Sequence, residues 1–315
     1  MKNIFFCIIF LIYSTADFAQ QSSNDSVLMF SYFKDNGEDG LHFAYSEDGL
    51  QWSALRNDSS YLSPAVGNER LIRDPCIIQG PDGIFRLICT VSWKDTGIGY
   101  ASSKDLIHWS VEKFIPVMKN IAGAMNCWAP ELVYDQPSKQ YMIYWATTIP
   151  GKFPDTDSTG EDNYYNHRMY FTLTKDFVKF SASKLLYDPG FSIIDATIQA
   201  SNGQYIMFFK DETFKPSPKK NIHIAFSQHL TYGYGKPSTA ITGKYWAEGP
   251  TAIFFNNHWI VYFDKYMEQT MSAVTSSDLK IWTDISEKVV FPSGTRHGTV
   301  FKVNRKILNK MLEYK

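Results

Sequence analysis

The sequence predicts an all-β protein: a five-bladed β-propeller, closed where N-terminal strands pair with the last inner strand. Three observations predict this fold: a high aromatic content, a strand-and-turn pattern that recurs five times, and a second, interleaved series of strands. Aromatic residues make up 16% of the 315 residues, and aromatic side chains favour strands. Hydrophobic residues make up 44%, which is enough for a large core.

The first recurring pattern is a strand, then Ser or Thr, then Asp, then an aromatic residue four positions after the Asp. It recurs about every 50 to 70 residues, a period typical of propeller blades. The Asp suits a tight turn whose backbone its side chain caps, so we expect it to be structural, like the aromatic residues Trp52, Trp109 and Trp282. The copies read AYSEDGLQW, ASSKDLIHW, TLTKDFVKF, TSSDLKIW and, in degenerate form, AFSQHLTYG.

The second series supplies the inner strand of each blade. The fifth copy leaves no room for a complete blade before Lys315, so VLMFSYF and LHFAY near the N-terminus supply its missing strands. Pairing the two ends of the chain removes a sheet edge. A helix is expected only in the tail from Arg305 to Tyr314. The inner strands read RDPCII at Arg73, WAPELVY at Trp128, IDATIQA at Ile194, AEGPTAIFF at Ala247 and RHGTVFKV at Arg296.

The N-terminus reads as a targeting segment. Lys2 precedes an apolar run from Ile4 to Tyr13, and small residues follow, as in a signal peptide. We therefore predict a signal peptide over residues 1–19, cleaved between residues 16 and 21, and an exported protein, periplasmic or secreted. The run is too short to span a bilayer. Residues 20–315 would form the single propeller domain; a buried first strand or helix is the alternative for the apolar run.

Charge and cysteine content exclude several classes of function. Thirty-one basic residues balance 32 acidic ones without blocks of like charge, which argues against nucleic-acid or anionic-membrane binding. Cys76, Cys89 and Cys127 remain after cleavage, and we expect buried thiols, with a Cys76–Cys89 disulfide as the alternative. No Cys-x-x-Cys or His-x-x-x-His pair occurs, so the sequence does not support a zinc site.

Three carboxylates begin inner strands of three different blades. Inner strands run alike around one channel, so Asp74, Asp195 and Glu248 are expected on one rim, with His297 beside them and Glu131 deeper along its strand. Carboxylates in such a place are costly unless they are hydrated, paired or functional. Two carboxyl groups are the minimal equipment for glycoside hydrolysis, and a third nearby would raise the pKa of the proton donor. Binding of a channel ion or of ordered waters is the alternative.

These residues resemble glycoside hydrolase family 43. RDPCII, IDATI and WAEGPT are similar to its Asp, Asp, Glu signature, and WAPE and RHG are similar to further family features. The resemblance covers roughly residues 27 to 303. It implies an inverting hydrolase that releases α-L-arabinofuranosyl, β-xylosyl or β-galactofuranosyl units from plant-type oligo- or polysaccharides. It also implies that Asp74 is the general base, Glu248 the general acid and Asp195 the carboxylate that tunes and orients the acid.

One departure keeps two alternatives open. Arg73-Asp74-Pro75 also looks like the RDP triplet of the invertase-like family 32, but the Asn-Asp-Pro and Glu-Cys motifs of that family are absent. A retaining invertase-like hydrolase is therefore one alternative, and a non-catalytic carbohydrate-binding propeller is the other. Arg73 is also expected to lower the pKa of the neighbouring base.

Further residues are expected to contact the sugar. The insertion from 150 to 167 is expected to overhang the pocket and to bring His167 and Arg168 to it, whereas KDETFKPSPKKN from Lys210 reads as a solvated wall of the cleft. The chemistry requires no cofactor; a structural channel cation, calcium or sodium, is the alternative partner for His297. The predicted substrate-binding residues are Arg73, Trp93, Trp128, His167, Arg296 and His297.

Overall fold

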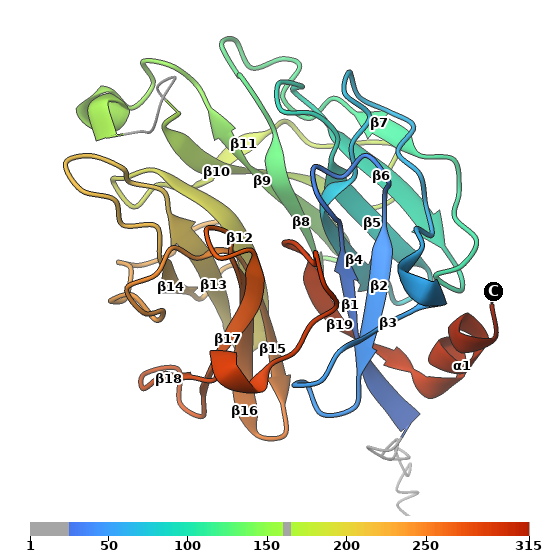
Figure 1. Ribbon diagram of the computed structural model, residues 1–315. Coiled ribbons are helices and arrows are strands. Elements are labelled where there is room, and N and C mark those ends of the chain that lie inside the picture. The colour runs from blue at the N-terminus through green and yellow to red at the C-terminus, as the bar shows by residue number, and fades with distance from the viewer. Residues whose placement is uncertain (1–24, 160–164, 315) are drawn as a thin grey trace, which may run out of the picture.

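Five antiparallel sheets form the blades of a β-propeller in the computed structural model, which describes residues 25–159 and 165–314 (Figure 1). The predicted fold class is confirmed. Each blade begins with the inner strand that the sequence predicted, and the chain then returns outward through hairpins, because short turns such as Gly80–Gly83 join consecutive antiparallel strands. The signal-peptide prediction falls on residues outside those that the structure describes.

The blades are numbered from the first complete one. Blade 1 contains β4 (Arg73–Gln79), β5 (Phe85–Thr90), β6 (Ile98–Ser103) and β7 (Lys113–Ile115). Blade 2 contains β8 (Trp128–Asp135), β9 (Gln140–Thr148), β10 (His167–Thr174) and β11 (Lys184–Tyr187). Blade 3 contains β12 (Ile193–Ser201), β13 (Gln204–Asp211) and β14 (Ile222–Ser227). Blade 4 contains β15 (Glu248–Phe255), β16 (His258–Lys265), β17 (Thr270–Ser276) and β18 (Thr283–Asp284).

Blade 5 joins the two ends of the chain, as predicted. It contains β19 (Thr299–Asn304), β1 (Ser26–Tyr32), β2 (His42–Ser46) and β3 (Ser53–Ala54). The register of β1 against β19 runs from Ser26↔Asn304 to Ser31↔Thr299. The predicted terminal helix is also confirmed as α1 (Arg305–Glu313), whose Leu308 and Met311 pack into the core under blades 1 and 5.

The Asp-containing turns are structural, as expected. Asp48 accepts the backbone N–H groups of Leu50 and Gln51 through one carboxylate oxygen, at 2.8 and 2.9 Å. Asp105, Asp176 and Asp278 repeat this arrangement. The aromatic residues of the pattern lie in or against the hydrophobic clusters between blades: Trp52, Trp109, Phe180 and Trp282.

Four inner strands begin with the same one-residue bulge. At each bulge the register advances by three residues along the inner strand but by only two along the neighbouring strand. In blade 1 the pair Arg73↔Thr90 is followed by the pair Cys76↔Ile88. The second residue of each bulge has a positive φ, a left-handed conformation that bends the strand and re-aims its side chains. These second residues are Asp74, Ala129, Asp195 and Gly249.

The three thiols that the sequence placed in the core are free and buried: Cys76, Cys89 and Cys127. The alternative Cys76–Cys89 disulfide is therefore wrong. Within residues 25–159 and 165–314, no helix has the length and apolar character that crossing a membrane requires.

Candidate active site

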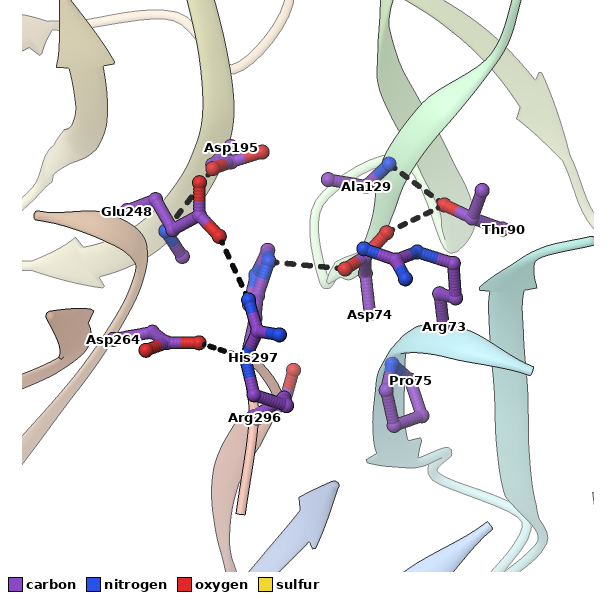
Figure 2. Close-up of polar contacts among 12 residues, drawn as sticks. Arg73, Asp74, Pro75, Thr90, Ala129, Asp195, Glu248, Asp264, Arg296 and His297 are labelled. Atoms are coloured by element: carbon purple, nitrogen blue, oxygen red, sulfur yellow. Dashed lines mark hydrogen bonds and ion pairs between the residues drawn. The ribbon is translucent and has the colours of Figure 1, made fainter. Parts of the chain in front are cut away.

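A cavity of about 630 Å³ opens at the rim where the inner strands begin. Its lining includes all nine predicted site residues: Arg73, Asp74, Trp93, Trp128, His167, Asp195, Glu248, Arg296 and His297. Residues from all five blades therefore meet at one place, as the shared direction of the inner strands requires. Figure 2 shows Asp74 on one side of His297, with Asp195 and Glu248 on the other.

Asp74 is held at both carboxylate oxygens. The hydroxyl of Thr90 donates to Oδ2 at 2.7 Å, and that hydroxyl in turn accepts the backbone N–H of Ala129 at 2.9 Å. Nδ1 of His297 lies 3.2 Å from Oδ1 (Figure 2). Burial alone would raise the pKa of Asp74, but His297, followed by the charge of Arg73 and the Thr90 bond, lowers it to about 2. Asp74 is therefore ionised at neutral pH, and Arg73 contributes to the lowering as expected.

His297 is the cationic partner of this group. Burial opposes its charge, but its bond to Asp74 and the nearby carboxylates raise the pKa of His297 to about 9. Its ring packs on the backbone of Gly249, where an added Cβ would lie only 2.3 Å from the ring. The glycine of the Glu-Gly-Pro sequence is therefore required both by its left-handed φ of 58° and by the close approach of His297.

Asp195 differs from Asp74 in the direction in which its pKa is shifted. Its Oδ2 accepts the backbone N–H of Gly249 at 3.0 Å. Burial raises the pKa of Asp195 above its usual range, although His297 and Lys210 act in the opposite direction. The pKa values of the two aspartates at equivalent bulge positions thus shift in opposite directions, because His297 bonds to one of them directly.

Glu248 lies between two cations. Nζ of Lys210 is 3.0 Å from Oε2, and Nη2 of Arg296 is 3.4 Å from Oε1. Arg296 also donates from Nε to Oδ2 of Asp264 at 2.5 Å. Asp264 is fully buried on β16, directly opposite Glu248 in the register of blade 4. Burial, followed by the charge of Glu248, raises the pKa of Asp264.

Sequence reasoning missed Lys210, Glu212, Lys220 and Asp264. The expected solvated wall is wrong at both ends, because the side chains of Lys210 and Lys220 are 3% and 0% exposed. The available signal was a charged residue at the end of an apolar second strand, as in YIMFFK and WIVYFDK. Lys210 pairs with Ile194 across blade 3, which brings its side chain to the rim.

Aromatic side chains form one wall of the cavity. The rings of Trp93 and Trp128 meet edge to face with centroids 5.5 Å apart, and the guanidinium of Arg73 stacks 4.3 Å above Trp93. His167 stacks against Tyr165 and contacts Trp128. Burial lowers the pKa of His167 to about 3, so it is a neutral ring at physiological pH. Such a wall suits the apolar face of a sugar.

The insertion contributes to the cavity through Tyr165 and His167, and residues 160–164 of it lie outside the described residues. Arg168 does not contribute to the cavity. Its side chain is buried and pairs with Asp188 and Asn166. The expectation that it would reach a sugar subsite is wrong, because the side chains of successive strand residues point to opposite faces.

Glu131 lies in the channel rather than in the cavity lining. Its carboxylate accepts hydroxyl groups of Thr197, Thr299 and Tyr144 at 3.1 to 3.3 Å. Burial raises the pKa of Glu131 to about 7, although His297 and the hydroxyl groups oppose the shift. Among the described residues, no three His, Cys, Asp or Glu side chains are grouped to hold a metal ion. A channel cation stays a prediction.

The fold and the cavity together define a five-bladed propeller with an acidic site on its rim. The chain belongs to the family of probable glycosyl hydrolase domains related to family 43, whose sequence model matches residues 25–309. The resemblance that RDPCII, IDATI and WAEGPT indicated is confirmed at the level of the family.

Individual relatives are distant. An α-L-arabinofuranosidase of Bifidobacterium longum is 32% identical over 101 residues, which cover 30% of this chain and 9% of that protein. The crystal structure of an α-L-arabinofuranosidase from Lactobacillus brevis matches with a TM-score of 0.54 and 19% identity, over 68% of this chain and 72% of that one. A thermostable family-43 glycoside hydrolase matches with a TM-score of 0.56 and 18% identity, over 72% and 78%. At these identities the solved structures support the fold.

The His297–Asp74 pair predicts a specific pH dependence of stability. The folded-state pKa of His297 is about 9 against 6.5 for the free side chain, so its contribution is complete below pH 6.5 and is lost as the pH rises through 9. We expect His297→Gln to lower the free energy of unfolding most at pH 6 and least above pH 9. Denaturant titrations of both proteins across this pH range measure the difference in their free energy of unfolding.

The exposed His258 supplies the control. His258→Gln should leave the pH dependence of the wild-type protein unchanged. A His297→Gln variant whose stability follows the wild-type pH profile in parallel would show that His297 is not held as a cation.

Proposed function

We propose that the protein is an inverting glycoside hydrolase that removes pentofuranosyl or pentosyl units from glycans. The observation that carries the proposal is the meeting of Asp74, Asp195 and Glu248, from three blades, in one cavity with an aromatic wall. A purely structural role would not require three carboxylates to share one partly open cavity, since burying each is costly.

Asp74 is the proposed general base. Its low pKa keeps it ionised, and its bonds to Thr90 and His297 fix the carboxylate plane. In an inverting hydrolase the base takes a proton from a water that attacks the anomeric carbon from the face opposite the leaving group. The position of Asp74 across His297 from Glu248 (Figure 2) supports this division of roles.

Glu248 is the proposed general acid, which protonates the departing glycosidic oxygen. Asp195 faces it from blade 3, bonded to the backbone N–H of Gly249, the residue that follows Glu248. This bond links the two residues, so Asp195 orients the strand segment that carries the acid. A carboxyl group close to an acid also helps it keep its proton, by like-charge repulsion.

The substrate class rests on the relatives and on the cavity. Proteins named as α-L-arabinofuranosidases appear among both the sequence and the structural relatives, so an arabinofuranosyl unit is the first candidate, with xylosyl and galactofuranosyl units next. Export after removal of residues 1–19 is part of the proposal, because glycans of this kind lie outside the cell. N-terminal sequencing of the mature protein tests that part.

Substitution of the two reacting carboxylates separates their roles. We expect Asp74→Ala and Glu248→Ala each to lower kcat/KM on an unactivated arabinofuranoside by about 10³-fold. On an aryl glycoside with a good leaving group, Glu248→Ala should lose far less, because such a group departs without a proton, whereas Asp74→Ala should lose as much as before.

The exposed Glu287 provides a matched carboxylate control, and Glu287→Gln should keep the wild-type rate on both substrates. Wild-type rates for Asp74→Ala and Glu248→Ala on the unactivated glycoside would contradict the proposed site. If the wild-type protein binds the sugars without hydrolysing any of them, the carbohydrate-binding alternative replaces this proposal.

A further inference from the structure

Six charged side chains of alternating sign are paired in a row, and four of them line the cavity: Lys210, Glu212, Glu248 and Arg296. Lys220 pairs with Glu212, and Glu212 pairs with Nζ of Lys210 at 2.8 Å. Lys210 reaches Glu248 at 3.0 Å. On its other side, Glu248 meets Arg296, which pairs with Asp264. The order along this charge chain is Lys220, Glu212, Lys210, Glu248, Arg296, Asp264.

Most of the charge chain is poorly solvated. The side chains of Lys210 and Glu212 are 3% and 12% exposed, so the charges act on one another through little water and their interactions are strong. Burial disfavours the charge of Lys210, but Glu212 and Glu248 outweigh it and raise the pKa of Lys210 well above its usual value. Burial likewise opposes the charge of Glu212, but Lys210 and Lys220 lower the pKa of Glu212.

Lys210 divides its charge between two carboxylates. An ammonium 3.0 Å from Glu248 favours the ionised form of that carboxylate, whereas a general acid must carry a proton. Glu212 draws the same ammonium toward itself and so weakens its effect on Glu248. A lysine that only neutralised a buried acid would pair with Glu212 alone; this one also bonds to a group that lines the cavity.

We propose that Lys210 is a positioning residue for Glu248, and that Glu212, which shares the ammonium group of Lys210, sets how strongly Lys210 binds the carboxylate of Glu248. This inference rests on the proposed function, because it takes Glu248 as the general acid. Lys210 fixes the carboxylate of Glu248 at Oε2, and the strength of that contact decides at which pH the acid is lost.

Other charged groups also face Glu248 from the elements packed around it. Asp195 on β12 and Asp264 on β16 are carboxyl groups that interact with Glu248, and Arg296 and His297, ahead of β19, are cations that do so. Asp74, in blade 1, pairs with His297. The ring of Tyr266 lies 4.6 Å from Nζ of Lys210. All of these stay in place when Lys210 or Glu212 alone is changed, so the direction of any pH shift reports on the changed residue.

The test is the alkaline limb of kcat/KM on an unactivated alkyl arabinofuranoside, where loss of the acid proton limits the rate. Lys210→Met removes the cation, so we expect the limb to move to higher pH by about 1 to 3 units. Glu212→Gln removes the carboxylate that competes with Glu248 for Lys210, so the limb should move to lower pH, by less. Lys210→Arg keeps the charge and should keep the limb within about half a unit of wild type.

A dinitrophenyl glycoside serves as the internal control. Its leaving group needs no proton, so none of these shifts should appear with it. Shifts of the same sign for Lys210→Met and Glu212→Gln, or no shift in either, would overturn the inference. If Lys210→Met does not fold, the downward shift of Glu212→Gln and the wild-type limb of Lys210→Arg decide the question.

Failure of this inference is distinguishable from failure of the proposed function. If Glu248→Ala loses the same activity on alkyl and dinitrophenyl glycosides, Glu248 is not the acid and the proposed function fails. If Glu248→Ala shows the expected dependence on the leaving group and the limbs do not move, only the role of Lys210 and Glu212 is wrong.

Discussion

The one-residue bulge at the start of the inner strands is the constraint on which the site depends. It turns the second residue into a left-handed conformation, which costs about 1 kcal/mol or more for a residue with a side chain, and which Asp tolerates better than most. In return, the bulge exposes a backbone N–H at the rim. The N–H of Ala129 supports Asp74 through Thr90, and the N–H of Gly249 supports Asp195. Each of the two aspartates is thus held by the bulge of the next blade.

Burial then separates the acids by the partners that each one meets. The carboxyl groups of Asp74 and Asp195 are both desolvated, which favours their neutral forms. His297 bonds directly to Asp74 and reverses this effect there, whereas Asp195 receives a neutral N–H and keeps a raised pKa. An ionised carboxylate on one side of the cavity is the base that inverting hydrolysis requires. The propeller creates it by placing a single histidine, from the blade that closes the ring, beside only one of the two aspartates.

The sequence predicted the features that repeat. Blade number, ring closure, the capped Asp turns and seven of the nine predicted site residues follow from recurring patterns, because those seven lie where inner strands begin; Trp93 and His167 do not. Features that occur once were missed. Lys210 and Asp264 lie on second strands, and they reach the rim only because of the registers Ile194↔Lys210 and Glu248↔Asp264. No local pattern reveals a register. The loop after Lys210 looked solvated because the sequence does not show that Lys210 and Lys220 both pair with Glu212 while buried.

The same distinction explains why the sequence misplaced Arg168 and did not reveal the surroundings of Glu131. Arg168 adjoins His167, but alternation along β10 directs it to Asp188 instead of the cavity. Glu131 lies two residues after the bulge residue Ala129, the position that Thr197 has after Asp195 in blade 3. Its three hydroxyl partners come from three blades, so its surroundings could be predicted only after the blades were placed around one axis.

The central claim is that Asp74 and Glu248 act from opposite sides of the sugar, as base and acid of a single displacement. Proton NMR of the mature protein acting on an α-L-arabinofuranoside tests it most directly, because the anomer released first reports the stereochemistry before mutarotation. The account predicts initial release of the β-anomer, with inversion. Initial release of the α-anomer would contradict it, since retention requires a covalent intermediate on a carboxylate, a role that the account assigns to no residue.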